Sequence, residues 1–506
     1  MGMFDLFRRT RAAAPVVSLA PGAVGGFTPG PARRNWLAAQ SSRLTADLPG
    51  GAAAAPNRDI RQQLSVLRAR SRWLAQNDGH TAGLLKMLRR NIVGPTGFAL
   101  QMRVRDDRDP TRQDANANDR IEAAWSEWGT VGNCEMTRRL SFTDLCGLAV
   151  VGMARDGEAF IRRVRSPRAG RFGYALHVID PSQVPEDVNG RPPGTPAGHV
   201  VRAGVELDAW GAPAAYFVRS AVPNDDPAIG GVSVRTDRIP ADEMFHLFLA
   251  EWPGQVRGVP WISPGLRTLA MLDGYQEAEL TAARVAAGKM GFYTMGGDED
   301  PPGDLEADGN LVQQAEAGSF ELLPKGVDFK EFNPQHPTQA FKDFVAAALR
   351  PVASAVGMSY AAFANDAAGM NYSALRATEL EDRDEFRTLQ AMVIGALCRR
   401  VFRDWLEQAL LVDAFGGLPA SKLWKFDAPQ FTARGWQWVD PGNEVSANAE
   451  AVALGIKSRT QIVAESGGDI AQVAADLKAE AEMFGDLLKP AAPPAQPTPA
   501  QDSIGA

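Results

Sequence analysis

The sequence lacks the features by which membrane-spanning, secreted and disulfide-linked proteins are identified. Across 506 residues no stretch approaches the ~20 consecutive apolar residues of a membrane-spanning helix, and the longest candidate, Leu145–Ala154, is too short. Residues 1–11 contain no apolar core of a secretory signal and indicate a basic arm instead. Only three cysteines occur, Cys134, Cys146 and Cys398, and they form no Cys-x-x-Cys spacing. A reducing, cytoplasmic setting is the simplest interpretation.

Motifs that carry catalysis or bind nucleotides are also scarce. The segment Ala287–Lys289 lacks the upstream glycine and the following hydroxyl of a phosphate-binding loop. The five histidines are scattered without metal-ligand spacing, and no Gly-x-Ser-x-Gly sequence occurs. Asp156 and Glu158 are candidates for an acid/base pair, but a solvated turn between a helix and a strand is the favoured interpretation. We therefore predict no catalytic residues, no metal and no cofactor.

The charge balance is acidic, with 60 Asp and Glu against 53 Lys and Arg and a net charge of −7. A conventional DNA-binding protein presents a basic patch, because affinity for duplex DNA comes mostly from neutralising its phosphates. A protein that contacts DNA without holding it tightly needs no such patch, and the balance is compatible with this kind of contact. An ordinary acidic surface explains it equally well.

Two sets of residues in predicted helices have alternative interpretations. Four tryptophans could stack on nucleobases, but packing in a core or between subunits is favoured: Trp36, Trp73, Trp125 and Trp128. A basic run could contact DNA or an acidic neighbour, and it could equally form a solvated face with ion pairs between subunits: Arg61, Arg68, Arg70, Arg72, Arg89 and Arg90.

The most informative pattern is a helix, a short loop and a much longer helix. Apolar residues at three- and four-residue steps predict a first helix that opens at Thr338 as N-cap and ends at Gly357. A small polar loop, Phe363–Met370, follows and has little to bury. From Asn371 to about Leu411 a second helix is predicted, ~60 Å long at 1.5 Å per residue. Its predicted buried stripe consists of Leu389, Val393, Ala396, Leu397, Val401, Trp405 and Ala409.

Periodicity elsewhere predicts a mixture of helices and short strands. Helices are predicted over 57–93, 117–154, 263–290 and 444–485, the third with Ser263 as its N-cap. Strands are predicted over 96–105, 159–164, 175–179, 204–207, 215–218, 244–249, 320–323 and 327–332. The Ala-, Pro- and Gly-rich residues 1–34 and the Pro-rich tail are predicted to be disordered.

An ordered set of short motifs resembles the lambda family of phage portal proteins. The first is an Arg-rich helix that ends in the run Asn-Ile-Val-Gly-Pro-Thr-Gly at Asn91–Gly97. Further motifs follow in the family's order: Trp125 with Trp128, Ser141-Phe142, Arg155–Glu158, Ile179–Pro181, Gly204–Glu206 with Gly211–Pro213, Arg257–Pro260, Asn371–Ser373 after the short loop, Trp438–Pro441 and Gly455–Arg459. Each motif alone is weak, but the ordered set extends from about residue 35 to about residue 485.

The resemblance implies an α+β portal-protein fold. Its parts are a mixed α/β wing, a two-helix stem, a small β clip, a tunnel loop followed by a long wing helix, and a helical crown. The implied boundaries are a disordered N-terminal arm at 1–34, the wing at 35–262, the stem helices at 263–293 and 338–357, the clip at 294–337, the tunnel loop at 358–371, the long helix and wing at 372–443, the crown at 444–487 and a disordered tail at 488–506.

The same resemblance implies a structural function rather than an enzymatic one. A ring of about twelve copies at one capsid vertex would form the channel for genome packaging and ejection. The implied partners are other copies of the chain, the large terminase subunit, a head–tail connector, the major capsid and scaffold proteins, and double-stranded DNA that passes without sequence preference. The implied location is the virion, after assembly in a host cytoplasm or from a prophage. A capsid-associated maturation hydrolase is the alternative, although no nucleophile–base set supports it.

Two groups of site residues follow from the resemblance. The DNA-facing tunnel loop consists of Phe363, Asn365, Asp366, Gly369, Met370 and Asn371. Phe363 and Met370 are expected to be apolar tips near the duplex. The clip contact for terminase and the connector consists of Asp298, Glu299, Asp300, Asp304, Glu306 and Lys325.

Overall fold

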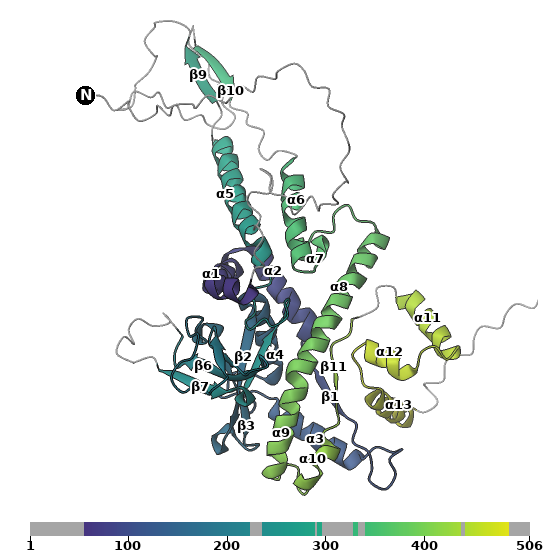
Figure 1. Cartoon of the computed structure of the whole chain (residues 1–506). Coiled ribbons are helices and arrows are strands. Elements are labelled where there is room, and N and C mark those ends of the chain that lie inside the picture. Colours follow the sequence, from purple (N-terminus) through teal and green to yellow (C-terminus); the bar gives the residue numbers. More distant parts are fainter. Residues whose placement is uncertain are drawn as a thin grey trace, which may run out of the picture. The chain divides into compact units, whose positions relative to one another are not determined.

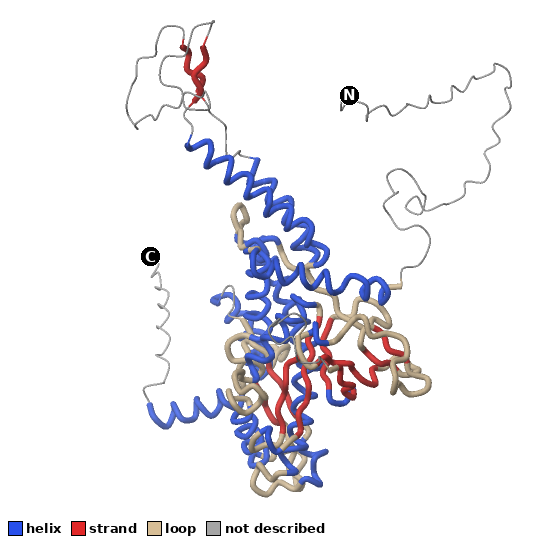
Figure 2. The backbone as a smooth tube through the Cα atoms, turned by 90° about the vertical axis from the view of Figure 1, so that its left-hand side faces the viewer, coloured by secondary structure: helices blue, strands red, loops and turns tan. Residues whose placement is uncertain are grey.

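The computed structural model describes residues 55–222, 235–288, 291–295, 327–331, 340–436 and 441–484 (Figure 1). The predicted arm (1–34) and tail (488–506), the strand predicted over 320–323 and the predicted N-cap Thr338 lie outside these residues. The described part combines helices with four small antiparallel sheets (Figure 2). The architecture is therefore α+β, as predicted.

The helices of the described part are α1 (Pro56–Asn77), α2 (Gly79–Leu88), α3 (Ala115–Trp128), α4 (Phe142–Asp156), α5 (Leu266–Gly288), α6 (Ala340–Ala355), α7 (Tyr360–Ala364), α8 (Tyr372–Val393), α9 (Arg399–Leu411), α10 (Leu423–Phe426), α11 (Pro441–Ala453), α12 (Arg459–Glu465) and α13 (Ile470–Phe484). The strands are β1 (Ala99–Met102), β2 (Glu158–Arg165), β3 (Tyr174–Ile179), β4 (Val200–Arg202), β5 (Val205–Leu207), β6 (Pro213–Arg219), β7 (Thr236–Pro240), β8 (Met244–Phe248), β9 (Gly291–Met295), β10 (Val327–Glu331) and β11 (Pro429–Thr432).

The helix predicted over 57–93 is confirmed, with one interruption. α1 begins with Pro56, whose fixed φ suits the first helical turn. Asp78 separates α1 from α2, because its carboxylate accepts the Thr81 N–H at 2.6 Å and caps the second helix. A π-helical turn over Arg89–Val93 then leads to Gly94, whose φ of 71° ends the helical run.

The main core lies where α3, α4 and α9 meet. Trp128 is fully buried and donates its indole N–H to the Tyr174 carbonyl at 2.9 Å. Trp125 packs its ring 5.1 Å from that of Trp405 on α9. The predicted helical stretch 117–154 is two helices, because the chain turns at 129–141 before Ser141 opens α4 with a reciprocal capping box to Asp144.

A second core lies between two antiparallel sheets, with strand orders β3-β2-β8 and β4-β5-β6-β7. Its buried residues come from both sheets: Phe160, Ile179, Val205, Leu207, Tyr216, Val218, Ile239 and Met244. The five strands predicted between residues 159 and 249 are confirmed as β2, β3, β5, β6 and β8. The strands β4 and β7 were not predicted.

Helices α5 and α6 lie side by side (Figures 1 and 2), as the pattern predicts. The ring of Tyr275 on α5 lies 5.8 Å from that of Phe341 and 5.0 Å from that of Phe344 on α6. The prediction of Ser263 as N-cap is wrong, because a 3-10 turn precedes α5 and the buried Ser263 hydroxyl has no hydrogen-bond partner.

The predicted end of the first stem helix also needs correction. Residues 291–293, assigned to that helix by the boundary 263–293, lie in β9. Strand β9 pairs antiparallel with β10, with Gly291 opposite Glu331 and Met295 opposite Val327. A small β unit in this part of the chain is thus confirmed, although it begins earlier than predicted.

The predicted long helix is confirmed as α8 and α9, joined by a π-helical turn over Ile394–Cys398. Asn371 caps α8 by accepting the Ala374 N–H at 2.8 Å. Six residues of the predicted stripe are buried and Ala396 is half-buried. The stripe buries only the later part of the helix, since Tyr372, Leu375 and Leu380 are exposed.

The C-terminal helices α11, α12 and α13 confirm the helical prediction for 444–485. Their apolar residues cover little, because Val445 on α11 is 52% exposed and Leu477 on α13 is 59% exposed. The preceding strand β11 pairs antiparallel with β1, with Leu100 opposite Phe431. The chain thus returns to its N-terminal part before α11.

Candidate functional site

The loop between α7 and α8 is the candidate DNA-facing element. Of its residues Asn365, Gly369 and Asn371 are exposed, while Asp366 and Met370 are half-buried. Asn365 has a φ of 51° and Gly369 a φ of 80°, so the chain reverses sharply at both ends of a short turn. The exposure agrees with a surface loop, and a role toward DNA remains a prediction.

Phe363 is an exception to the predicted loop. It lies in α7 rather than in a loop, and only 3% of its surface is exposed. Its ring stacks on that of His80 at 5.9 Å. The prediction of Phe363 as an exposed apolar tip is therefore wrong, because it anchors α7 in the main core instead.

The loop connects α7 and α8, and hydrogen bonds fix these two helices to each other. Asp382 on α8 accepts the Ser359 N–H at 2.8 Å and the Ser359 hydroxyl at 2.6 Å. Ser359 in turn caps α7 by accepting the Ala362 N–H at 3.2 Å. Sequence reasoning missed Asp382. Its spacing was the available signal, because Asp382 precedes the buried Phe386 by four residues and so lies on the same face of α8.

Within the loop, Asp366 organises the turn. Its carboxylate accepts the Ala368 N–H at 2.9 Å and the Tyr360 hydroxyl at 3.2 Å. The hydrogen bond from Ala368, helped by Tyr360 and by the charge of Lys342, lowers the pKa of Asp366. The loop therefore carries a negative charge at neutral pH, which disfavours tight contact with phosphates.

The Arg155–Glu158 motif is not the predicted solvated turn. Asp156 and Glu158 are 1% and 0% exposed. Glu158 binds the Arg257 guanidinium at 2.6 Å, Arg68 on α1 at 2.9 Å and His246 on β8 at 2.9 Å. Both carboxylates are fully engaged by cations, so the acid/base alternative gains no support either.

Backbone geometry brings Arg257 to Glu158. Gly157 has a φ of 90°, and a Cβ there would lie 2.6 Å from the Val259 nitrogen, so only glycine allows this approach. The Gly258 N–H also donates to Glu158 at 3.2 Å. Glu158 therefore joins α1, β2, β8 and the 257–259 segment.

Burial alone would raise the pKa of Glu158, but the charges and hydrogen bonds of Arg257 and His246 overcome it and hold the pKa well below its usual range. Burial lowers the pKa of His246, despite its bond to Glu158. At neutral pH the cluster thus holds an ionised Glu158 between guanidinium groups and a neutral imidazole. The charges of this cluster therefore offset one another inside the protein.

The basic run divides between the interior and the surface. Arg68 pairs with Glu158 and Glu186, and Arg72 pairs with Asp156 and Asp180, so these two do not belong to a solvated face. The other four arginines of the run are exposed: Arg61, Arg70, Arg89 and Arg90. Of these, Arg89 pairs with Asp144. Trp125 and Trp128 are core residues as favoured, whereas Trp73 is 51% exposed and Trp36 lies outside the described residues.

The residues of the predicted clip contact, Asp298, Glu299, Asp300, Asp304, Glu306 and Lys325, lie outside the described residues.

Among the residues that the structure does describe, no cluster of three His, Cys, Asp or Glu side chains could hold a metal ion. Within the same ranges, no helix is both long and apolar enough to cross a membrane. A hydrogen bond with Cys398, together with burial, holds the pKa of the Cys146 thiol well above its usual range, so this thiol is poorly reactive.

Comparison with known proteins gives consistent matches. The family model described as "Phage portal protein, lambda family" matches residues 42–390. A protein of Halomonas phage phiHAP-1 named "Probable portal protein" is 33% identical over 446 residues, covering 85% of this chain and 82% of the relative. Portal protein B of Escherichia phage lambda is 23% identical over 470 residues, covering 84% and 85%.

Two solved structures with a similar chain are of gene transfer agent (GTA) particles. One, titled "Neck of empty GTA particle computed with C6 symmetry", has a TM-score of 0.44 and 16% identity, covering 80% of this chain and 94% of that chain. Another, titled "Virion of native gene transfer agent (GTA) particle", has a TM-score of 0.43 and 15% identity, covering 81% and 97%.

Proposed function

The chain belongs to the lambda family of phage portal proteins, and from this premise we propose that copies of it close into a ring of about twelve subunits at one vertex of a capsid. The ring is the channel through which double-stranded DNA enters during packaging and leaves during ejection. The protein resides in the virion and is assembled in a host cytoplasm, from a phage genome or a prophage.

The observation that carries this proposal is the anchored loop between α7 and α8. Its ends are fixed to each other through Ser359 and Asp382, while Asn365 and Gly369 at its tip are exposed. Such a loop can touch a passing ligand without taking part in the subunit's own core. Contacts from Asn365, Asp366, Met370 and Asn371 would be weak and blind to sequence, as sliding DNA requires.

The remaining segments take the roles that the family suggests. Helices α5 and α6 form the stem, β9 and β10 belong to the clip, α8 and α9 span the wing, and α11–α13 form the crown. The clip is proposed to dock the large terminase subunit during packaging and a head–tail connector afterwards. The wing and crown are proposed to meet the major capsid and scaffold proteins. The chain supplies no catalysis in this scheme and receives force from a separate motor.

Electron microscopy of the purified protein in negative stain tests the proposal. We expect rings with a central hole and about twelve subunits in projection. A sample that remains monomeric at micromolar concentration, and that cleaves capsid protein, would contradict the proposal and favour the maturation hydrolase.

A further inference from the structure

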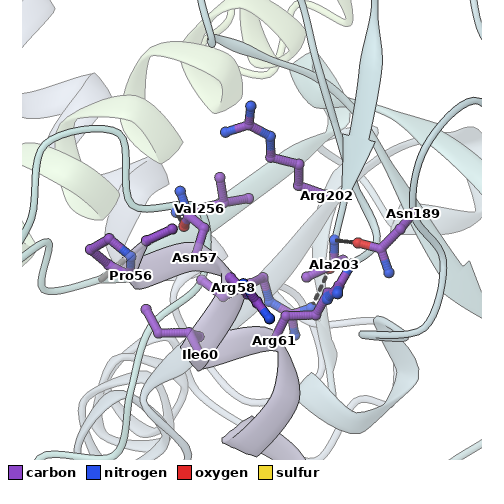
Figure 3. A pocket seen from close by; sticks show the side chains of 11 residues that line it. Pro56, Asn57, Arg58, Ile60, Arg61, Asn189, Arg202, Ala203 and Val256 are labelled. Carbon is purple, nitrogen blue, oxygen red and sulfur yellow. Dashed lines mark hydrogen bonds between the residues drawn. The ribbon is translucent and has the colours of Figure 1, made fainter. Parts of the chain in front are cut away.

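A hollow of 420 Å³ lies beside the first turn of α1 (Figure 3). Arg58 and Arg61 reach it from α1, and Arg202 reaches it from the end of β4. Its floor is apolar, because Ile60, Val256 and Ala203 are each 9% exposed or less. We call this hollow the arginine pocket.

The polar groups of the arginine pocket fall into two classes. Asn57 and Asn189 are committed to the backbone: Asn57 accepts the Val256 N–H at 2.9 Å, and Asn189 accepts the Ala203 N–H at 2.8 Å. Arg257, which also lines the pocket, is paired with Glu158. The guanidinium groups of Arg58, Arg61 and Arg202, in contrast, make no hydrogen bond or ion pair with any residue that the structure describes.

Nearby carboxylates do not neutralise these three arginines. Arg61 also borders an adjoining hollow that contains Glu186 and Asp187. Glu186 pairs with Arg68, and Asp187 pairs with Arg219. Asp59 follows Arg58 on α1 and is exposed. Arg58 and Arg61 are one turn apart on the same helix, where like charges repel. The pocket therefore presents surplus positive charge over an apolar floor, which suits a carboxylate side chain with apolar neighbours.

We propose that the arginine pocket receives a carboxylate from the adjacent copy of this chain and so contributes to closing the ring. This rests on the ring in the proposed function. The residues before α1 are unsuitable occupants, because residues 1–54 carry six arginines and only two acids, Asp5 and Asp47. Since the whole chain is −7 and that segment is +4, residues 55–506 carry −11.

Every neighbouring copy in a ring therefore offers surplus carboxylates at a fixed orientation. In a head-to-tail ring a basic patch on one side of a subunit faces a different surface on the next, so complementary charge can be repeated at each interface. Duplex DNA is a poor occupant, because its phosphates lie on a broad cylinder that cannot enter a recess of this size.

The test uses the full chain with Arg58→Glu and Arg61→Glu combined. The control combines Arg112→Glu and Arg139→Glu, which reverse two exposed arginines outside the pocket and leave the net charge of the two variants equal. Ring formation is followed by light scattering against protein concentration at about 50 mM salt, where surface charges are least screened. Circular dichroism melting reports whether each subunit is folded.

The pocket variant should need about tenfold more protein for half-assembly than the wild type or the control, and high salt should reduce the difference. Inorganic phosphate at fixed ionic strength should compete with wild-type assembly and leave the pocket variant unaffected.

Equal assembly of the folded pocket variant and the wild type would overturn the inference. So would phosphate that raises the melting temperature of the subunit without affecting assembly, since the pocket would then bind a free anion only. Absence of rings from the wild type and the control alike would instead count against the proposed function itself.

Discussion

Glu158 connects α1 with the sheet formed by β3, β2 and β8. It is fully buried and touches three cationic or ionisable partners, none of them adjacent in sequence. Removing one partner of a buried ion pair costs more than the pair contributes, because the remaining charge loses both water and counter-ion. The cluster is therefore sensitive to the loss of a single charge.

We expect Glu158→Gln to lower the free energy of unfolding by about 3–5 kcal/mol, because Arg257 and Arg68 lose their counter-ion inside the protein. Urea denaturation of wild type and variant at neutral pH measures the change. Glu243→Gln is the matched control, since its pair with Arg162 is 39–41% exposed and should matter by only about 0–1 kcal/mol. Equal losses in both variants would contradict this account of the cluster.

The same variant has a predictable pH dependence. The pKa of Glu158 is lower in the folded than in the unfolded chain. The ionised carboxylate therefore makes its full contribution to the free energy of unfolding at neutral pH. That contribution is lost as the pH falls below the ordinary glutamic acid value of 4.5. The difference in stability between wild type and Glu158→Gln should accordingly shrink on acidification, and a difference that grows would refute the assignment of an ionised Glu158.

Trp405 tests the main core in the same way. It is fully buried, and four of its aromatic neighbours lie with ring centres within 5.9 Å. Trp405→Ala should lower the free energy of unfolding by about 3–5 kcal/mol, through lost contacts and the cavity that remains. Trp424→Ala is the control, because Trp424 is 77% exposed, and the free energy of unfolding should change little in this variant. A stable Trp405→Ala subunit would exclude Trp405 from the core.

Two residues show where sequence reasoning fails at this scale. Arg-Asp-Gly-Glu has the composition of a solvated turn, and only Arg68 and Arg257, which are 90 and 99 residues away, make Glu158 a buried group. Phe363 borders a run of small and polar residues, so the pattern assigned it to the loop. Its partner His80 lies 283 positions earlier, and no local pattern reveals that contact.

At the scale of elements, local periodicity predicted most of the structure. The strands β2, β3, β5, β6 and β8 alternate or are continuously apolar, and the stripe from Leu389 to Ala409 predicted the later part of the long helix. The strand β4 is Val-Val-Arg and β7 is Thr-Asp-Arg-Ile-Pro, and each has only one buried side chain. Such elements exist because neighbours pair with them, not because their own sequence favours a strand.

The loop between α7 and α8 yields the prediction that belongs to this scale. Replacing Asn365–Met370 with a shorter Gly-Ser link should leave the subunit and its assembly intact, because shortening a flexible connection changes stability little. Packaging or retention of DNA should fail, since every copy loses its contact at once. Ring assembly and packaged DNA length are measured separately for this purpose.

The corrected position of Phe363 supplies the control for the loop. Phe363→Ala should destabilise the subunit by about 3–5 kcal/mol, because it empties a buried site. A loop variant that forms normal rings and still packages and retains full-length DNA would leave the loop as ordinary surface.

For the whole molecule, the ordered motifs carried more information than any one element. The sequence resemblance extended over the same part of the chain that the family model matches, residues 42–390, and beyond it. The pairing of β1 with β11, more than 300 residues apart, was not predictable, because register between distant strands depends on the assembled core. The joint at Glu158 was missed for the same reason.

The acidic balance of the chain leads to a prediction about docking. The segment 298–308 contains Asp298, Glu299, Asp300, Asp304, Glu306 and Asp308, a local surplus of negative charge in the proposed clip. Opposite charge on an approaching terminase would speed encounter through long-range attraction. Replacing the six acids by their amides should slow docking, and the deficit should shrink as salt screens the field.

The matched control removes acids from another part of the molecule. Glu450, Glu480 and Glu482 on α11 and α13 are exposed, and their amides remove three charges without touching the clip. They are compared with a clip variant in which only Asp298, Glu299 and Asp300 are replaced, so that both variants lose the same number of charges. If the attraction is local, docking of these variants should follow the wild type at every salt concentration, whereas the clip variant falls behind most at low salt. Stopped-flow docking rates that respond equally to both sets would show that net charge alone acts, and rates indifferent to charge and salt would exclude electrostatic steering at the clip.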